Sequence, residues 1–528
     1  MQGFHQEVIG LLAGYAPVWL VGGAVRDYLL GTESKDMDLV STLEIEKADE
    51  ILREHGYRPH KIGAKFTTIS LFQGEGRIDI TCVTDLEQDA RRRDFTINAM
   101  YMNPDNGQIF DPLDGRRDLK EKILRTCNQP EITFKQDPVR ILRMVKLAVK
   151  LGFNIEDKVW SQAREQINLL VQTAKERVTA ELAEILVLSE AEKAVNMLWD
   201  LSYWHVFIPE LARLKGVVQN QYHSLDVWDH TMAVFRNTPQ DLFLRLAGLF
   251  HDLGKWETAS REYYLAGKLE YRDDNYWLEG CQIIGTRGKN ELDYKLHPLL
   301  GKQVKMLGAR LDHFPQVVQF KRLLSHEEVP QGLTQVENGK RHFLNHERAS
   351  AKLAAEILKR YSFAMFFPGK GEKREKDLVE LIANHMQATL IFMPELRGEP
   401  TRKPFRDRAA ALVWQTCWNG REFELQKIHD FILLWRADFQ AGKVHTEEQN
   451  EVLDKITGEL IQIALWQNEN LPKINWKNFR QFSVSQGIKG EELGIFKSRV
   501  RARAMQEMQI ELNSHFLKKV YAEIKRWG

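Results

Sequence analysis

The chain has 528 residues, and 74 Lys and Arg against 73 Asp and Glu leave a formal net charge of +1. This length is too great for one hydrophobic core, so we expect several domains. The balanced charge excludes a nucleic-acid partner held by a global positive field, although a local basic surface could bind one. Four dispersed cysteines without a CxxC pair argue against disulfides and structural zinc. Without a signal-peptide pattern or a bilayer-length apolar stretch, we expect a cytoplasmic protein and no membrane partner.

Short β-rich runs alternate with helical runs in the first quarter of the chain. Residues 18–21 and 38–40 have the composition of buried strands. Residues 66–72 and 77–83 are predicted to pair as a hairpin around the turn at 73–76. The pattern indicates a mixed α/β domain.

Helical spacing of apolar residues dominates after Pro138. The first four predicted helices cover residues 139–150, 158–173, 178–188 and 191–201. Most of the remainder is also predicted to be helical, with surface loops at 367–376 and 397–408. Residues 257–341 lack helical periodicity and are predicted to form an insertion.

A glycine-rich turn follows the first predicted strand, in the run GGAVRD at residues 22–27. Such a strand–turn–helix presents backbone N–H groups to phosphate, and Arg26 can add a charged fork. Two glycines by themselves are weak evidence, because turns of this kind are common.

A pair of acidic residues, Asp36 and Asp38, comes next. At positions i and i+2 of a strand their side chains point to the same face. Two close carboxylates repel each other unless a cation lies between them, and Mg²⁺ prefers such oxygen ligands. Asp79, on the predicted strand at 77–83, is a suitable third carboxylate. Solvated acids at a strand end are the alternative for an isolated pair.

Further motifs follow in a fixed order: RRRDFTINA at 91–99, DPLDGRRDL at 111–119, QDPVRILR at 136–143 and Glu-Arg at 176–177. In order and spacing they resemble the motif series of class II tRNA nucleotidyltransferases, which are related to bacterial poly(A) polymerases. The resemblance covers residues 18–201. It implies that Asp36 and Asp38 hold a catalytic Mg²⁺. The residues that it implies for nucleotide binding are Gly23 and Arg26 at the triphosphate, Arg93 and Asn98 at the triphosphate or ribose, and Asp137, Arg140 and Arg143 at the base.

Asp137 and Arg140 also have a physical reason to read a base. A helix would place them at i and i+3 on one face. Cytosine and adenine both offer an amino donor beside a ring-nitrogen acceptor, which suit a carboxylate and a guanidinium. Uracil and guanine present the opposite order, and each unpaired buried polar group would cost about 1–3 kcal/mol. An ordinary surface ion pair is the alternative.

Three features depart from the family's pattern. Gln136 stands where the family usually has Glu, and Lys146 replaces an arginine, which keeps the charge but weakens a bidentate phosphate contact. Only residues 81–90 separate the third-carboxylate strand from the RRDFT motif, where CCA-adding members have a longer flexible loop. A shortened loop resembles the CC-adding subfamily, so complete CCA addition and CC-only addition both remain open.

A second constellation begins with HDLGK at residues 251–255, after an apolar helix predicted at 242–250. Adjacent His251 and Asp252 can both reach one divalent ion. Together with His230 upstream and Asp438 downstream they resemble the HD phosphohydrolase superfamily.

Two histidines between these positions, His346 and His385, are candidate ligands of a second ion, with His342 and the more remote His326 as competitors of His346. The resemblance implies a divalent transition metal such as Ni or Mn. A metal-bound water would then attack a phosphoester, with Lys255 supporting the transition-state charge. A degenerate HD fold without metal is the alternative.

Basic residues recur near the C-terminus, at Lys497, Arg499, Arg501, Arg503, Lys518, Lys519, Lys525 and Arg526. Solvated faces are the usual meaning of such runs, but they suit phosphate contacts to A-form RNA. Residues 486–493 (QGIKGEEL) also resemble the C-terminus of HD-bearing bacterial CCA enzymes.

The resemblances imply an α/β polymerase-β-type nucleotidyltransferase head followed by an all-α neck, body and HD domain. The expected divisions are a head at 1–127, a neck at 128–205, an HD domain at 206–445 with the insertion at 257–341, and a tRNA-binding tail at 446–528. The implied function is CCA addition to tRNA from CTP and ATP, with a phosphohydrolase attached. The alternatives are CC-only addition, a poly(A) polymerase, and an HD phosphodiesterase whose head merely binds RNA. The sequence leaves the oligomeric state open.

Overall fold

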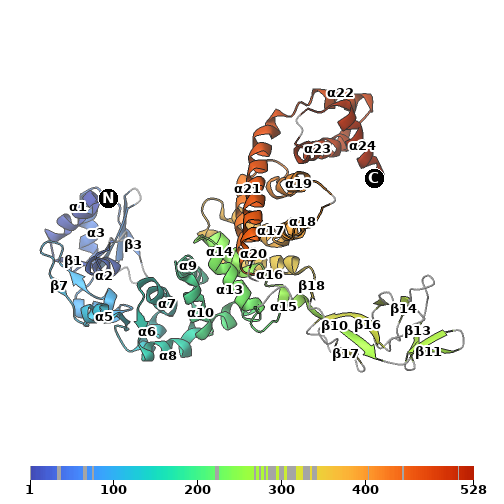
Figure 1. The fold of residues 1–528 in the computed structure, drawn as a ribbon. Coiled ribbons are helices and arrows are strands. Elements are labelled where there is room, and N and C mark those ends of the chain that lie inside the picture. The colour runs from blue at the N-terminus through green and yellow to red at the C-terminus, as the bar shows by residue number, and fades with distance from the viewer. Residues whose placement is uncertain are drawn as a thin grey trace. The chain divides into compact units, whose positions relative to one another are not determined.

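The computed structural model describes residues 2–32, 37–62, 68–73, 76–219, 225–266, 342–401, 403–442, 445–508 and 511–527, and seven short strands between 269 and 335. These residues divide into two compact units, Met1–Phe207 and Ile208–Gly528, which Figure 1 colours from blue to teal and from green to red. In the described part, no helix combines the length and the apolarity that a bilayer crossing requires.

A seven-stranded sheet forms the centre of the first unit, in the order β3-β4-β5-β2-β1-β6-β7. Its strands are β1 (Val18–Val21), β2 (Met37–Ser41), β3 (His60–Ile62), β4 (Thr68–Gln73), β5 (Gly76–Cys82), β6 (Tyr101–Met102) and β7 (Ile109–Phe110). Only β2 and β5 pair in parallel among these described strands. The antiparallel β4–β5 pair confirms the predicted hairpin, although residues 66–67 and the turn residues 74–75 lie outside the described residues.

Helices cover both faces of this sheet. They are α1 (Gln2–Ala13), α2 (Gly23–Leu29), α3 (Ile45–Glu54), α4 (Leu86–Arg92), η1 (Thr96–Asn98) and α5 (Gly115–Glu121). Leu39 and Ile78 lie in the buried cluster that contains α1 and α3 side chains, whereas Val40 belongs to the cluster with Ala90 of α4. Because side chains alternate along a strand, Asp38 shares the face of Val40, which is the face of α4.

The remainder of the first unit is helical, with a two-stranded parallel sheet of β8 (Ile123–Leu124) and β9 (Asn154–Ile155). Its helices are α6 (Pro130–Gln136), α7 (Arg140–Leu151), α8 (Asp157–Gln166), η2 (Ile167–Gln172), α9 (Lys175–Leu186), α10 (Ala191–Asp200) and α11 (Tyr203–Phe207). Helix α7 buries one face against α9 and α10 and ends at Gly152, whose φ of 67° is left-handed. The helix predicted at 158–173 becomes a 3₁₀ turn after Gln166, so its second half was wrong.

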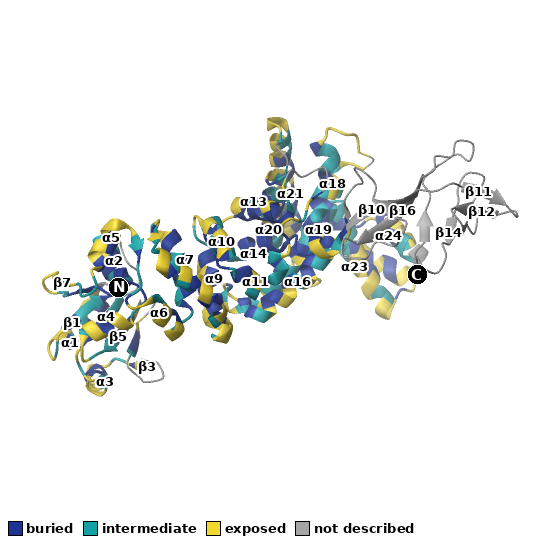
Figure 2. Ribbon diagram, turned by 90° about the horizontal axis from the view of Figure 1, so that it is seen from below, coloured by how far each residue is buried: buried dark blue, intermediate teal, exposed yellow. Residues whose placement is uncertain are grey.

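The second unit is mainly helical. Its helices are α12 (Pro209–Ala212), α13 (Val227–Asn237), α14 (Leu242–Phe250), α15 (Lys255–Thr258), α16 (His346–Tyr361), η3 (Phe363–Phe366), α17 (Gly371–Asn384), α18 (Met386–Leu396), α19 (Phe405–Cys417), α20 (Leu425–Gln440), α21 (Glu447–Asn470), η4 (Leu471–Lys473), α22 (Lys477–Ser485), α23 (Gly490–Gln506) and α24 (Ser514–Trp527). Figure 2 shows α14 and α20 largely buried at its centre. The loops predicted at 367–376 and 397–408 are shorter, because α17 begins at Gly371 and α19 at Phe405.

After the end of α15 at Thr258, the described backbone of the segment predicted as an insertion consists of strands, and β18 follows the segment directly. They are β10 (Ala259–Ala266), β11 (Leu269–Arg272), β12 (Asn275–Leu278), β13 (Cys281–Ile283), β14 (Asp293–Lys295), β15 (Gln303–Lys305), β16 (Val317–Leu324), β17 (Leu333–Gln335) and β18 (His342–Phe343). Ala259 pairs with Phe343, so the segment leaves and re-enters the helical body at one place. The remaining backbone of 257–341, including His326, lies outside the described residues.

Candidate functional site

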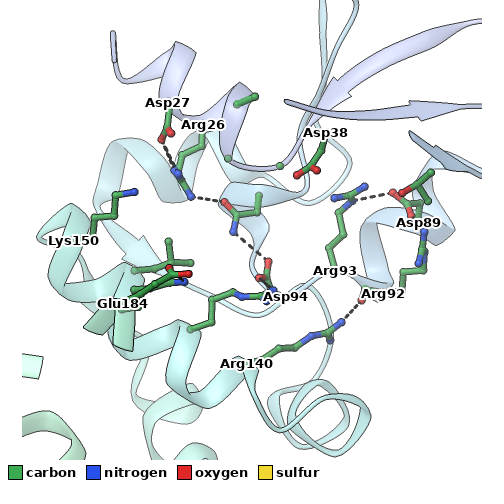
Figure 3. Close-up of a pocket in the computed structure, with 18 of the residues that line it drawn as sticks. Arg26, Asp27, Asp38, Asp89, Arg92, Arg93, Asp94, Arg140, Lys150 and Glu184 are labelled. Atoms are coloured by element: carbon green, nitrogen blue, oxygen red, sulfur yellow. Dashed lines mark hydrogen bonds and ion pairs between the residues drawn. The ribbon is translucent and has the colours of Figure 1, made fainter. Parts of the chain in front are cut away.

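A cavity of about 880 Å³ opens in the first unit, between the α4 face of the sheet and helix α7 (Figure 3). The residues around it are Gly22, Gly23, Ala24, Arg26, Asp27, Asp38, Thr81, Asp89, Arg92, Arg93, Asp94, Asn98, Arg140, Arg143, Lys146, Leu147, Lys150, Glu184, Val187 and Leu188. The predicted residues Gly23, Arg26, Asp38, Arg93, Asn98, Arg140 and Arg143 are therefore gathered in one place. The wall carries five carboxylates and seven Lys and Arg side chains, a combination that suits a polyanionic ligand with a metal ion.

The turn between β1 and α2 approaches Asp38 so closely that it requires glycine. Gly22 has a φ of 78°, and a Cβ built on it would lie 2.9 Å from Oδ2 of Asp38. The carboxylate therefore occupies the space that a side chain at Gly22 would fill. Asp36, its predicted partner, lies outside the described residues.

Asp79 lies directly beside Asp38 in the parallel pairing of β2 and β5, on the same face of the sheet. Nε and Nη2 of Arg77 donate to its two oxygens at 3.0 and 2.7 Å, and the Ser70 hydroxyl also donates to it. Arg77 therefore neutralises the Asp79 carboxylate in this arrangement. Asp79 is not among the residues around the cavity.

A polar chain joins the phosphate side of the cavity to α7. Nη1 of Arg26 donates to Oδ1 of Asn98 at 2.8 Å, and Nδ2 of Asn98 donates to Asp94 at 3.2 Å. Arg143 donates to Asp94 at 3.0 Å and to Glu181 of α9 at 3.2 Å. Burial alone would raise the pKa of Asp94, but Arg143, the Phe95 amide and Asn98 hold that pKa below its ordinary value. Arg143 therefore lines the cavity and connects Asp94 with Glu181.

The expectation that Asp137 and Arg140 share one helix was wrong. Helix α6 ends at Gln136, Asp137 is extended (φ −150°, ψ 96°), and α7 begins at Arg140. Pro138 disfavours helical backbone at the residue before it, which explains the break. Arg140 lines the cavity and donates to the Arg92 carbonyl at 2.6 Å.

Asp137 instead pairs with Arg177, whose Nη2 donates to Oδ2 at 2.8 Å. Its Oδ1 is buried without a hydrogen-bond partner among the described residues. An unsatisfied buried acceptor of this kind suits an amino donor that arrives with a ligand.

The structure also shows where the three departures from the family's pattern lie. Lys146 lies in the cavity wall between Glu181 and Glu184, at 2.5 and 2.6 Å, so its charge is already shared by two carboxylates. Gln136 is exposed at the end of α6. The residues 83–85 alone connect β5 to α4, where Asp85 accepts from the Glu87 amide at 2.8 Å and caps the helix.

Sequence reasoning assigned no role to Asp89, Asp94 or Glu181, which bind the cavity's arginines. The spacing of Asp89 and Arg93, four residues apart, could have indicated the first pair. The other two contacts join residues 38 or 49 positions apart, which no local pattern reveals.

The six residues predicted for the second constellation converge inside the second unit. His230, His251 and Asp438 form one group, and Asp252, His346 and His385 form another; in each group, one ligand atom from each residue lies within 4.8 Å of the others. Asp252 joins the two groups, because Oδ2 lies 3.2 Å from Nε2 of His251 and Oδ1 lies 3.3 Å from Nε2 of His346. Helices α13, α14, α16, α17 and α20 bring these residues together.

The ring orientations of three histidines favour metal ligation. Nδ1 of His251, His346 and His385 lies 2.7–2.8 Å from the backbone carbonyl three residues earlier, which leaves Nε2 as an acceptor. Those three Nε2 atoms and Oδ1 of Asp252 are buried without hydrogen-bond partners among the described residues, whereas Oδ2 of Asp252 pairs with Lys255. Burial, with the neighbouring histidines, lowers the pKa of His385 to about 3, so its ring is neutral at neutral pH. Imidazole nitrogens and carboxylate oxygens in such an arrangement fit divalent cations.

Other predicted residues lie around this cluster. Lys255 is buried, with Nζ 2.7 Å from Asp252 and 2.7 Å from Oε1 of Gln219. His346 begins α16 and joins the cluster, which places it ahead of its competitors; the side chain of His342 and all of His326 lie outside the described residues.

Several basic residues of the tail already have partners. Arg501 lies over Trp418 and Trp476, and Lys497 also lies over Trp476. Arg503 and Lys519 both pair with Glu507. Arg499 and Lys518 are exposed, whereas the side chains of Lys525 and Arg526 lie outside the described residues.

Comparison with known proteins identifies the head. Residues 18–84 and 81–125 match the family described as poly A polymerase head domain, and residues 152–215 match the probable RNA and SrmB-binding site of polymerase A. A multifunctional CCA protein of Neisseria gonorrhoeae is 37% identical over 266 residues, 46% of this chain and 62% of that protein. An A-adding tRNA nucleotidyltransferase of Deinococcus radiodurans is 32% identical over 51% of this chain and 64% of its own length. The chain thus spans less than two thirds of these relatives.

A solved structure of similar fold is the Bacillus stearothermophilus CCA-adding enzyme in complex with CTP. It covers 100% of this chain and 99% of its own, with a TM-score of 0.58 and 17% identity. The residues that match the poly A polymerase head domain contain the seven-stranded sheet and the glycine turn beside the cavity. Through its N-terminal half, the chain is therefore similar to tRNA nucleotidyltransferases and to the poly A polymerase head domain.

Proposed function

We propose that the chain adds the 3′-terminal C and A residues to tRNA from CTP and ATP, without a nucleic-acid template, and that its second unit is a metal-dependent HD phosphohydrolase. The observation that carries the transferase is the cavity in which Asp38 and the Gly22–Gly23 turn oppose a row of basic residues on α7. Its volume of about 880 Å³ is within the range of ligand pockets. One relative is named a multifunctional CCA protein and the other an A-adding tRNA nucleotidyltransferase, and these names support the same substrates here.

In the proposed reaction the 3′-hydroxyl of tRNA attacks the α-phosphorus of the nucleotide. The bond from that phosphorus to the bridging oxygen breaks, and pyrophosphate leaves with the electron pair. Asp36, Asp38 and Asp79 would hold Mg²⁺, which supplies charge stabilisation at the phosphates when bound. Asp79 would have to leave Arg77 for this role, so its assignment is the weaker member of the set.

The nucleotide is proposed to lie along the cavity with its phosphates at α2 and its base at α7. Gly23 and Arg26 would bind the triphosphate, and Arg93 and Asn98 would contact the triphosphate or ribose. Asp137 and Arg140 would read the base across the α6–α7 break rather than along one helix face. Arg143 would act beneath them by holding Asp94 and Glu181.

The connection between β5 and α4 bears on whether two or three nucleotides are added. Only residues 83–85 connect β5 to α4, so CC-only addition is the second candidate beside the proposed CCA addition. Incubating tRNA that lacks CCA with CTP alone, and then with CTP and ATP, separates the possibilities by product length. Extension by three nucleotides in the second reaction supports CCA addition, whereas a product that stops after two supports CC-only addition.

Two further outcomes would contradict the transferase as proposed. Long A tails on arbitrary RNA without CTP would indicate a poly(A) polymerase. No incorporation at all, beside intact phosphodiesterase activity, would indicate an HD enzyme whose head only binds RNA. Replacing Asp38 with Ala should abolish incorporation while tRNA binding survives.

The proposed HD activity rests on the buried, unsatisfied ligand atoms of His251, Asp252, His346 and His385. Asp252, with one oxygen near each group, would help to hold a transition metal such as Ni or Mn together with the histidines. When bound, such ions lower the pKa of a coordinated water and so provide a nucleophile for phosphoester hydrolysis. Hydrolysis of a 2′,3′-cyclic nucleotide should therefore require Mn²⁺ or Ni²⁺. Asp252→Ala should abolish this hydrolysis and leave nucleotide incorporation unchanged.

A further inference from the structure

Asp89, on α4, is a buried carboxylate that touches two arginines of the cavity. Its side chain is 0% exposed, and its Oδ2 accepts from Nε of Arg93 at 2.8 Å and from the hydroxyl of Tyr101 at 2.7 Å. Its Oδ1 pairs with Arg92. A buried carboxylate is costly unless it is fully paired, and here two cations and a phenol pair it.

The contact with Asp89 determines how Arg93 faces the cavity. Arg93 donates to Asp89 through Nε, and this Nε also lies 3.3 Å from the Tyr101 oxygen. Both terminal amino groups of Arg93 have no partner among the described residues, and Figure 3 shows the guanidinium turned toward Asp89 at the cavity's edge. When an arginine is held through Nε, its two terminal nitrogens remain as paired donors. This geometry suits bidentate hydrogen bonds to phosphate oxygens.

The same carboxylate supports the base side of the cavity. Through Arg92 and Arg93 it holds the last turn of α4, and the Arg92 carbonyl accepts from Nη2 of Arg140 at 2.6 Å. Burial acts to lower the pKa of Arg93, but Asp89 and Tyr101 together raise it, so the guanidinium stays charged. Burial also raises the pKa of Tyr101, which keeps its hydroxyl a donor.

We infer that Asp89 is a positioning residue for the incoming nucleotide, which holds Arg93 toward the triphosphate and, through Arg92, Arg140 toward the base. Tyr101 assists, because its hydroxyl donates a hydrogen bond to the Asp89 carboxylate. The inference rests on the proposed nucleotidyl transfer and extends it to residues that do not themselves touch the nucleotide.

The test compares Asp89→Asn, Tyr101→Phe and the double variant in the full chain, with Glu87→Gln as the matched control. Glu87 is an exposed carboxylate on the same helix, outside the cavity. Calorimetric titration with CTP and Mg²⁺ should show affinity lowered about 10- to 100-fold in Asp89→Asn and less in Tyr101→Phe. The KM for CTP should rise with it, while the KM for tRNA stays within about twofold. Adding Tyr101→Phe to Asp89→Asn should cost little more, because Tyr101 acts through Asp89.

Three results would overturn the inference: a wild-type chain that binds no CTP, wild-type CTP affinity in Asp89→Asn, or equal losses for CTP and tRNA, which would indicate a structural role. Glu87→Gln should match the wild type in every measurement, and a loss there would also count against a role specific to Asp89. A wild-type chain that binds CTP but extends no tRNA would contradict the proposed function alone.

Discussion

Arg26 and Asn98 lie 72 positions apart in the chain, yet Nη1 of Arg26 donates to Oδ1 of Asn98 at 2.8 Å. The amide thereby turns its nitrogen to Asp94, 3.2 Å away. One small side chain thus connects the glycine turn of α2 with the RRDFT motif and, through Asp94, with α7. The phosphate end and the base end of the proposed nucleotide site share this connection.

Replacing Asn98 with Ala should weaken nucleotide binding more than it weakens the fold. The change removes an acceptor from Arg26 and a donor from Asp94, each a hydrogen bond to a charged group that contributes about 1.5–3 kcal/mol. Calorimetric titration should show CTP affinity lowered by at least about tenfold. Asn103→Ala, in the turn between β6 and β7, is the control and should bind CTP normally. Unchanged affinity in Asn98→Ala would contradict a role for this amide at the nucleotide.

Gly22→Ala should abolish or strongly reduce nucleotide incorporation, because the new methyl group would meet Oδ2 of Asp38 at 2.9 Å. Gly31→Ala is a matched control, since Gly31 also has a left-handed φ, 73°, but has open space around it. Each variant carries backbone strain of about 1–3 kcal/mol, because each glycine has a positive φ. Only Gly22→Ala also brings a methyl group against the carboxylate. Equal activities of the two variants, measured at equal folded fraction, would show that the approach to Asp38 is unimportant.

Asp94→Asn should make stability less dependent on acid pH. The pKa of Asp94 is lowered from 3.8 in the folded chain, so its ionised form contributes stability that is fully present above 3.8 and is lost as the pH falls through the folded value. Urea unfolding at pH 7 should show the variant less stable by about 1–3 kcal/mol. At pH 3 this difference should shrink. The exposed Asp105→Asn is the control and should show no such change; an equal deficit of Asp94→Asn at both pH values would contradict the assignment.

His385→Ala should lower the metal content of the second unit. It removes one of three possible ligands in its group, and the loss of a ligand weakens a site that otherwise has buried atoms ready for an ion. Chains stripped with a chelator and reloaded with Mn²⁺ or Ni²⁺ can be compared by elemental analysis and by melting temperature. His429→Ala, on the exposed face of α20, should keep the wild-type content. A wild-type chain that takes up no metal, with no rise in melting temperature, would support a degenerate HD fold.

Much of the site was predictable because its signals are local or recur in a fixed order. The strand before the glycine turn, the β4–β5 hairpin and the α7 helix follow from the periodicity of neighbouring residues. The six residues of the HD constellation were found from motif order. The structure places them in two groups of three, and within each group one ligand atom per residue lies within 4.8 Å of the others. Their roles as ligands stay predictions.

Tertiary structure alone decided which charges meet. Pro138 divides Asp137 from Arg140, although the base-reading hypothesis had placed both residues on one helix. The pairs Arg143–Asp94, Arg143–Glu181 and Arg177–Asp137 join residues 38 to 49 positions apart. A sequence specifies local backbone preference and which residues are apolar, but a long-range ion pair forms only where packing brings two side chains together. The sequence by itself therefore determined the kinds of residues at the site, and the fold determined their partners.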